Sequence, residues 1–162
     1  MLILFDIDMT LLETDHIGIT LLENAGRELF HERFTAEGIN FGGCLDPVII
    51  AQMLINNTVD NTPDNITALR KHYHTGLQRT ANERPIARAL PGAHELVAAT
   101  RAHDAIDAIG VLTGNYPETG AIKLTAGFDP SHFEINAWAM PRRTPSRSAR
   151  TCRLLRSRTF AR

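Results

Sequence analysis

The chain has few cysteines, no long apolar run, and no acidic residue after Glu134. Cys44 and Cys152 are the only cysteines in 162 residues, and they lie far apart with no paired spacing. This pattern favours reduced thiols over a disulfide scaffold or a zinc site. No run approaches the roughly eighteen apolar residues of a membrane span. Acids begin at Asp6, where a secretory signal would be basic and then apolar. We therefore expect a cytoplasmic protein with no membrane partner.

The missing acids produce a strong charge asymmetry. Residues 1–140 hold all 18 Asp and Glu but only nine of the 17 Lys and Arg, for a net charge of −9. Residues 141–162 hold eight Arg and no acid, for a net charge of +8. The body is typical of an acidic soluble domain. Residues 139–162 show neither the helix nor the strand period, so we expect a disordered basic tail there.

The apolar residues of the body predict alternating strands and helices. Residues 2–5 form an apolar run that is too short for a helix and suits a buried parallel strand. Helices are predicted at 14–33, opened by Thr14 or Asp15 as N-cap, and from Asp46-Pro47 onward. The remaining predicted elements are helices at 62–79, 93–101 and 117–126 and strands at 106–112 and 133–138. This order indicates an α/β protein with a helical insert after its first strand.

Two carboxylates directly follow the first predicted strand. Side chains one residue apart on an extended chain point the same way, so Asp6 and Asp8 are expected to converge. In a parallel sheet, the residues just past the carboxyl end of a strand face the ligand crevice. Two close anions need a cation or a shared proton, and Mg²⁺ with its preference for hard oxygen ligands meets that need. The alternative is a pair of surface acids in a loop.

Three segments in order resemble the signatures of the haloacid dehalogenase-like (HAD) superfamily. FDIDMTLL (5–12) is similar to the first signature, VLTGN (111–115) to the second, and Lys123 lies where the third places a lysine. Together with LPGAHELV (90–97) and GFDPSHFE (127–134), they resemble the phosphoglycolate phosphatase-like branch, which carries a helical cap inserted after the first signature. The resemblance implies a Rossmann-like three-layer parallel sheet with helices on both faces. It also implies a core of residues 1–13 and 89–138 and a cap of residues 14–88.

The resemblance also implies roles for single residues. Asp6 would be the nucleophile that forms an aspartyl-phosphate, and Asp8 the general acid and base. Thr113 would bind a phosphoryl oxygen, and Lys123 would neutralise charge on the phosphoryl group and on Asp6. Mg²⁺ would lie between the Asp6 carboxylate, the Asp8 backbone carbonyl and the phosphate. Because Asp8 is present, the sequence resembles the phosphatases of the superfamily and not its dehalogenases.

The remaining candidate residues have two interpretations each. Thr10, Gly114 and Asn115 are candidate substrate-binding residues, but they equally suit ordinary turns after the two strands. Asp46 lies where cap loops of this branch contact substrate, and it equally suits an N-cap before Pro47. Taken alone, Lys123 would be a solvated helix lysine.

One signature of the superfamily is missing. A pair of acids on a later strand would complete the Mg²⁺ site, but no acid follows Glu134. Without the strand that carries it, residues 2–5 would form an unpaired, aggregation-prone edge. We therefore expect weak or no turnover from a C-terminally incomplete fold. One hypothesis is that the tail is an out-of-frame reading of GC-rich DNA. The rival is a natural basic tail that binds nucleic acid or an acidic partner.

The sequence thus predicts a Mg²⁺-dependent phosphatase that acts on a small phosphorylated metabolite through an aspartyl-phosphate. Two alternatives stay open: a phosphomutase of the β-phosphoglucomutase type, which substrate profiling would separate, and a non-catalytic binding protein that uses its basic tail. The sequence predicts neither the substrate nor the oligomeric state.

Overall fold

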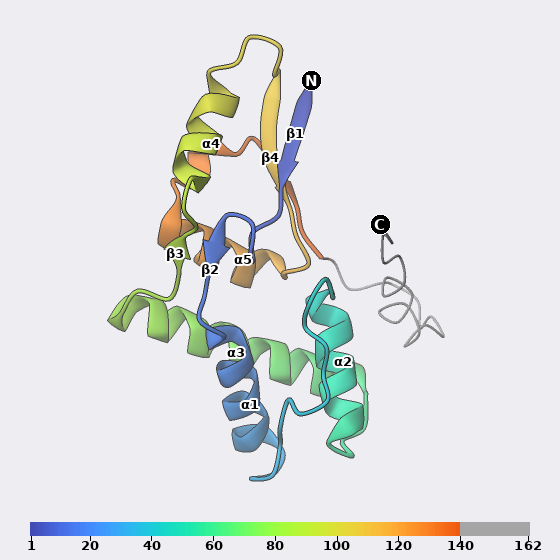
Figure 1. Cartoon of the computed structure of the whole chain (residues 1–162). Coiled ribbons are helices and arrows are strands. Elements are labelled where there is room, and N and C mark those ends of the chain that lie inside the picture. The colour runs from blue at the N-terminus through green and yellow to red at the C-terminus, as the bar shows by residue number, and fades with distance from the viewer. Residues whose placement is uncertain (140–162) are drawn as a thin grey trace, which may run out of the picture.

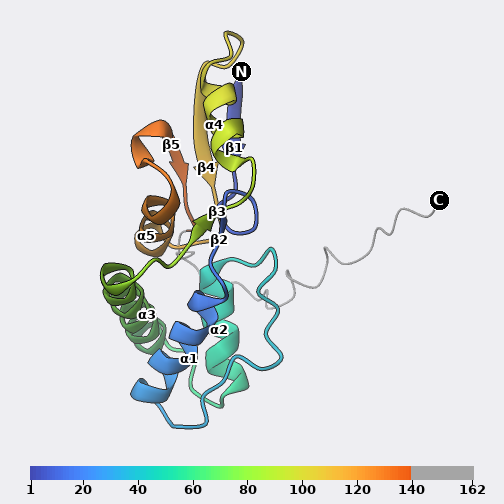
Figure 2. The same ribbon diagram turned by 60° about the vertical axis from the view of Figure 1, so that its left-hand side comes forward.

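The computed structural model describes residues 1–139. In it, a parallel sheet with two flanking helices lies above a unit of three helices (Figures 1 and 2). The basic tail expected at 139–162 lies outside the described residues except for Ala139, as does Cys152. The boundaries that the sequence predicts for a core and a cap stay a prediction. Within residues 1–139, no helix is both long and apolar enough to cross a membrane.

The sheet has three parallel strands, and its N-terminal strand lies at one edge. The strands are β1 (Leu2–Phe5), β4 (Ala108–Leu112) and β5 (Ile135–Ala137), in the order β1-β4-β5. The predicted first strand is confirmed, and the two later strands are slightly shorter than predicted. Gly110 of β4 lets β5 come close, because a Cβ there would lie 2.2 Å from the carbonyl oxygen of Ile135. Because all three strands are parallel, their carboxyl ends lie at the same edge of the sheet.

Helices cover one face of this sheet within residues 1–139. Apolar side chains of α4 (Ala93–Arg101) and α5 (Pro117–Gly127) form one core with Phe5, Ile109 and Val111. The alternate residues point to the other face, where the exposed apolar side chains are Leu2, Leu4, Leu112 and Ile135. The sequence predicts helices on both faces of the sheet. Among residues 1–139, helices cover only one face. A 3-10 helix, η1 (Pro130–His132), precedes β5.

Three helices form the second unit and have a hydrophobic core of their own. They are α1 (Ile17–Leu29), α2 (Asp46–Asn56) and α3 (Pro63–Glu83). The fully buried side chains of this core include Phe34, Ile50, Met53, Leu54, Leu69 and Leu77. Phe34 lies in the loop after α1, and the other positions follow the helical period, so that burial of these side chains stabilises the unit. α3 packs against both α1 and α5, so it joins the two units.

The starts of two helices differ from the sequence prediction. α1 begins at Ile17, and neither Thr14 nor Asp15 caps it. Its N-cap is His16, which has a left-handed backbone and offers no side-chain hydrogen bond to the helix. Asp15 is left-handed as well, so the chain turns sharply before α1. These two conformations have only a weak signal in the local sequence, because left-handed backbone is uncommon even for Asp and His, which adopt it more often than most residues.

The other two helices of the unit start with a proline in the first turn, as predicted. Thr62 caps α3 and accepts a hydrogen bond from the Asn65 N–H at 3.2 Å, at the start that the sequence predicts for this helix. Asp46 is not an N-cap. Leu45 takes that position, and Asp46 is the first residue of α2. The Asp46 carboxylate is thereby available for contacts outside its own helix.

The chain crosses between the two units twice, and the crossings pair with each other. β2 (Leu12–Glu13) and β3 (Arg88–Ala89) form a two-stranded antiparallel ribbon. Glu13 and Arg88 also form an ion pair. Strands of two residues carry no recognisable period, so the sequence did not predict this ribbon.

Candidate active site

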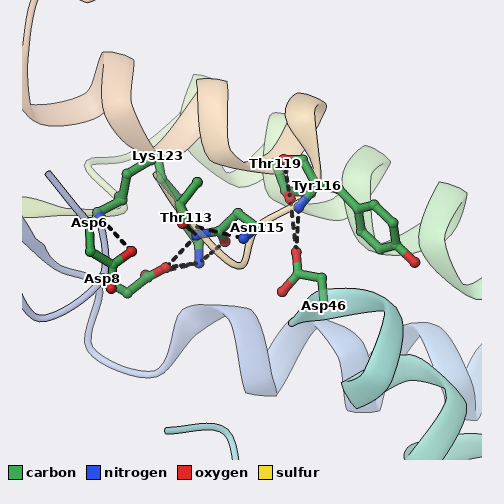
Figure 3. Close-up of polar contacts among 9 residues, drawn as sticks. Asp6, Asp8, Asp46, Thr113, Asn115, Tyr116, Thr119 and Lys123 are labelled. Atoms are coloured by element: carbon green, nitrogen blue, oxygen red, sulfur yellow. Dashed lines mark hydrogen bonds and ion pairs between the residues drawn. The ribbon is translucent and has the colours of Figure 1, made fainter. Parts of the chain in front are cut away.

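Asp6 and Asp8 lie at the carboxyl end of β1. Ile7, between them, is completely buried, and its N–H donates to Asp6 Oδ1 at 2.8 Å. The buried Ile7 side chain turns both carboxylates away from the core, toward the edge where β4 also ends (Figure 3). Asp6 is exposed, and 36% of the Asp8 side chain is exposed. The two acids therefore face the place where the sequence predicts a ligand.

Lys123 of α5 and Asn115 in the loop after β4 hold the Asp8 carboxylate. The Lys123 Nζ lies 2.9 Å from Asp8 Oδ1, 3.0 Å from Asp8 Oδ2 and 2.7 Å from Asn115 Oδ1. Asn115 Nδ2 donates to Asp8 Oδ2 at 2.6 Å and to Thr113 Oγ1 at 2.7 Å. Four of the predicted site residues thus form one hydrogen-bonded network (Figure 3). Lys123 contacts Asp8 directly, and it affects Asp6 only through its charge.

Burial and neighbouring charges set the protonation of these groups. Only 7% of Lys123 is exposed, and this burial alone would lower its pKa. Tyr73, Asp8 and Asp46 act in the opposite direction and leave the pKa of Lys123 raised, so the ammonium group stays charged. Partial burial, together with the charge of Asp8, raises the pKa of Asp6. The Ile7 N–H and the Thr113 hydroxyl partly offset that rise.

The donors at this edge suit a hard divalent cation. Mg²⁺ is bound in proteins through one or two carboxylates, with phosphate and water oxygens completing its shell. Asp6 has an exposed carboxylate whose pKa the neighbouring Asp8 raises, and a cation would relieve that repulsion. Within residues 1–139, no group of three or more His, Cys, Asp or Glu side chains could form a metal cage. The residues therefore fit a Mg²⁺ that shares its coordination with a phosphorylated ligand.

Asp46 reaches the sheet, but it does not join the Asp8 network. Its Oδ2 accepts hydrogen bonds from the Tyr116 N–H at 2.9 Å and from Thr119 Oγ1 at 3.3 Å. Its own N–H donates to the Gly114 carbonyl at 2.8 Å. Burial raises the pKa of the Asp46 carboxyl, while Lys123 and the Tyr116 N–H act to lower it. The contacts show Asp46 fastening the start of α2 to the loop after β4.

The remaining two predicted residues occupy turns. Gly114 allows the loop before α2 to come close, because a Cβ there would lie 2.7 Å from the Cys44 carbonyl oxygen. Thr10 is exposed, and its N–H donates to the Ile7 carbonyl at 3.4 Å in the turn after Asp8. Its hydroxyl has no hydrogen-bond partner among the described residues. The structure thus places Thr10 next to the site without bringing its side chain into the network.

The sequence reasoning missed a second contact between the two units. Arg70 of α3 forms a two-pronged ion pair with Glu118 of α5, in which Nη2 lies 2.7 Å from Oε2. The Arg70 guanidinium also lies 3.9 Å from the centre of the Tyr116 ring. Tyr116 is fully buried and extends into the core of the helical unit. Residues so far apart in sequence carry no pairing signal, so only the fold reveals this contact.

Comparison with known proteins supports the fold through structure alone. No family model matches the chain, and no curated protein matches it. Three solved structures resemble it with TM-scores of 0.60, 0.63 and 0.60. They are a predicted phosphoglycolate phosphatase from Haemophilus somnus 129PT, CbbY from Rhodobacter sphaeroides in complex with phosphate, and a hydrolase from Pseudomonas syringae. Their sequences are 16%, 21% and 18% identical to this chain.

The alignments cover most of this chain and a smaller share of its neighbours. They include 89%, 85% and 85% of this chain, and 65%, 63% and 60% of the three neighbours in the same order. The likeness shows that the chain shares the α/β fold of these three proteins. This confirms the fold class that the sequence predicts, and it supports the resemblance at the level of the fold.

Proposed function

We propose that this protein hydrolyses phosphate monoesters of small metabolites in a Mg²⁺-dependent reaction. The observation that carries the proposal is the network at the carboxyl ends of β1 and β4. There, Lys123 Nζ contacts both oxygens of Asp8 and the side chain of Asn115, next to the exposed carboxylate of Asp6. A nucleophile, an acid/base group and a fixed cation lie together in a HAD-like fold, which is the set of groups that phosphoryl transfer requires.

The chemistry assigned to the two acids proceeds in two balanced steps. An oxygen of Asp6 attacks the phosphorus atom, the bond from phosphorus to the ester oxygen breaks, and Asp8 gives a proton to the departing alkoxide. Water then attacks the phosphorus of the aspartyl-phosphate and gives a proton to Asp8. The bond from phosphorus to Asp6 breaks, which releases phosphate and restores both acids.

The neighbouring groups stabilise charge and geometry. The ammonium of Lys123 and the amide of Asn115 fix the position of the Asp8 carboxylate, and the buried Thr113 hydroxyl is a candidate donor to a phosphoryl oxygen. Asp6 and Asp8 are the residues that would hold Mg²⁺, which supplies charge neutralisation for the phosphoryl group. Asp46 has a positioning role, because its carboxylate is occupied by Tyr116 and Thr119.

The test follows the covalent intermediate as well as released phosphate, because weak or no turnover is expected from this chain. The purified chain is incubated with labelled phosphate esters in Mg²⁺ or in chelator and then quenched in acid. We expect label on the protein and phosphate release in Mg²⁺ only. Asp6→Asn should abolish both signals, and Asp8→Asn should slow them by about 10²–10⁴-fold.

Asp104→Asn is the matched control, because Asp104 is an exposed acid in the turn before β4, at the opposite end of that strand. It should leave both signals unchanged. Equal labelling of the wild-type chain and the Asp6→Asn variant would refute the assignment of the nucleophile. An absence of both label and phosphate release across a broad panel of esters would refute the proposed function.

A further inference from the structure

Asn115 is buried in the loop after β4, and both protons of its side chain are engaged. Only 3% of this residue is exposed. One proton of its Nδ2 group goes to Asp8 Oδ2 at 2.6 Å and the other to Thr113 Oγ1 at 2.7 Å (Figure 3). Its Oδ1 accepts a hydrogen bond from the Lys123 Nζ at 2.7 Å. A side-chain amide has two protons, so Asn115 keeps no side-chain donor for a ligand.

The charges of two neighbours set the direction of this amide. The ammonium group of Lys123 only donates hydrogen bonds, and the ionised carboxylate of Asp8 only accepts them. The amide therefore turns its oxygen to Lys123 and its nitrogen to Asp8. In the opposite orientation, two donors would face each other at Lys123 and two acceptors at Asp8.

The backbone and the packing hold Asn115 in the same place. Its carbonyl accepts a hydrogen bond from the Ala139 N–H at 2.9 Å, directly after β5. α5 lies against it, because a Cβ on Gly120 would come within 3.1 Å of the Asn115 Cβ. The amide is thus fixed before a ligand arrives, and its position determines what its other neighbour can do.

That neighbour is the Thr113 hydroxyl, whose oxygen faces two donors of Asn115. The backbone N–H lies 3.3 Å away and Nδ2 lies 2.7 Å away. An amide nitrogen does not accept hydrogen bonds, so the hydroxyl is the acceptor in both contacts. A hydroxyl has two acceptor lone pairs and one proton. With both lone pairs in use, the Thr113 proton points away from Asn115.

The open side of the Thr113 hydroxyl faces Asp6. Burial raises the pKa of the Asp6 carboxyl, and a hydrogen bond from the Thr113 hydroxyl acts against that rise. A phosphoryl group that reaches the Asp6 carboxylate therefore arrives beside the same proton. A donor that is already aimed at the place where charge develops needs no reorganisation during the reaction.

We propose that Asn115 is a positioning residue for phosphoryl transfer, which directs the Thr113 hydroxyl proton to the phosphoryl oxygens beside Asp6 and does not itself bind substrate. This inference rests on the proposed function, and it differs from the substrate-binding role that the sequence predicts for Asn115. Its hold on Asp8 matters only where the leaving group needs a proton. Its effect through Thr113 should be present for every ester.

The test separates these two effects by the choice of ester. In Mg²⁺, the initial rate of protein labelling is compared for p-nitrophenyl phosphate, whose leaving group departs without a proton, and for glycerol 3-phosphate, whose alkoxide needs one. Asn115→Ala should slow labelling by p-nitrophenyl phosphate about 10–100-fold, the effect of one lost hydrogen bond to a charged group. The loss with glycerol 3-phosphate should be larger, because Asp8 also loses a donor.

A double-mutant cycle tests whether Asn115 acts through Thr113. Thr113→Val removes the hydroxyl proton and should slow labelling by p-nitrophenyl phosphate by a similar factor. In that background, Asn115→Ala should cause no further loss with this ester, because no proton remains to be directed. A further loss as large as in the wild-type chain would mean that Asn115 acts by another route, and it would overturn the inference.

Asn57→Ala is the matched control for lost packing and stability. Asn57 is a buried asparagine of the helical unit with the same set of side-chain hydrogen bonds, one accepted by Oδ1 and two donated by Nδ2. Its replacement should lower the urea midpoint and leave labelling by both esters unchanged. If Asn57→Ala slowed labelling as much as Asn115→Ala, the loss would be one of stability and the inference would be wrong.

The remaining outcomes separate the two proposals. If Asn115→Ala does not fold, Asn115→Asp keeps the shape and the acceptor for Lys123, and its carboxylate should draw the Thr113 proton away from Asp6 and slow labelling at least as strongly. If the wild-type chain is labelled and these Asn115 variants are labelled at the same rate, the inference is wrong and the proposed function stands. If neither ester labels the wild-type chain or releases phosphate, the proposed function fails, and the inference fails with it.

Discussion

Replacement of Asp46 tests how the helical unit is fastened to the sheet. In Asp46→Ala, the buried Tyr116 N–H loses the acceptor that now lies 2.9 Å away. An unsatisfied buried donor costs about 1–3 kcal/mol. The Thr119 hydroxyl adds little to this cost, because it also lies 3.3 Å from the Tyr116 carbonyl and keeps that acceptor. Removing the desolvated carboxylate returns part of the loss. We therefore expect a net destabilisation of about 2 kcal/mol.

The assay is urea unfolding at pH 7, followed by circular dichroism. With a slope of about 2 kcal/mol per molar urea, the expected loss lowers the midpoint by about 1 M. Asp46→Asn is the matched variant, because its amide oxygen can accept the same two hydrogen bonds without burying a charge. It should unfold within about 0.5 kcal/mol of the wild-type chain. An unchanged midpoint for Asp46→Ala, or an equal loss in both variants, would refute this reasoning.

The pH dependence of the stability of the wild-type chain and of Asp46→Asn tests the direction of the pKa shift of Asp46. Burial raises the pKa of Asp46 above its usual value of 3.8, so protonation favours the folded state. This contribution is fully present below pH 3.8 and is lost as the pH rises through the raised pKa. The stability of Asp46→Asn relative to the wild-type chain should therefore increase as the pH rises from about 4 to 7. A constant or falling difference would contradict the raised pKa.

Three further substitutions test separate features of the fold. Gly110→Ala should destabilise the chain by about 3 kcal/mol in urea, because its Cβ would lie 2.2 Å from the Ile135 carbonyl oxygen; an unchanged midpoint would contradict the close approach of β5. Arg70→Met removes a partly exposed ion pair with Glu118 and should cost about 1 kcal/mol, less at high salt. A loss that does not depend on salt would point to packing instead. Met9→Gly should raise the thermal midpoint or leave it unchanged, because Met9 is 71% exposed and has a left-handed backbone with φ of 61°; a clear fall would indicate that its side chain packs.

The sequence predicts those parts of the fold that depend on local patterns. The apolar run of residues 2–5, the cap at Thr62 and the proline-led starts of α2 and α3 all have local signals, and the structure contains each of them. The position of Asp8 could be inferred because it follows the first strand, and that of Lys123 because the resemblance places a lysine on the helix after the second signature. Their contact at 2.9 Å is what the order of strands in a parallel sheet produces.

The remaining features depend on contacts between distant segments. Asp46 and the Tyr116 N–H are 70 residues apart, and nothing in either segment indicates that they pair. The start of α1 was misplaced because Asp15 and His16 adopt left-handed conformations that their sequence does not favour.

The ribbon of β2 and β3 has a consequence for how such a chain can be rebuilt. Leu12 pairs with Ala89 and Glu13 with Arg88, so the point where the chain leaves the sheet unit lies directly beside the point where it returns. A two-residue turn that joined Glu13 to Arg88 would close these strands into a β-hairpin. The sheet would then keep its register while the segment between the crossings was deleted or exchanged for another. Because the ribbon brings both ends of the helical segment together, another segment could be inserted between Glu13 and Arg88.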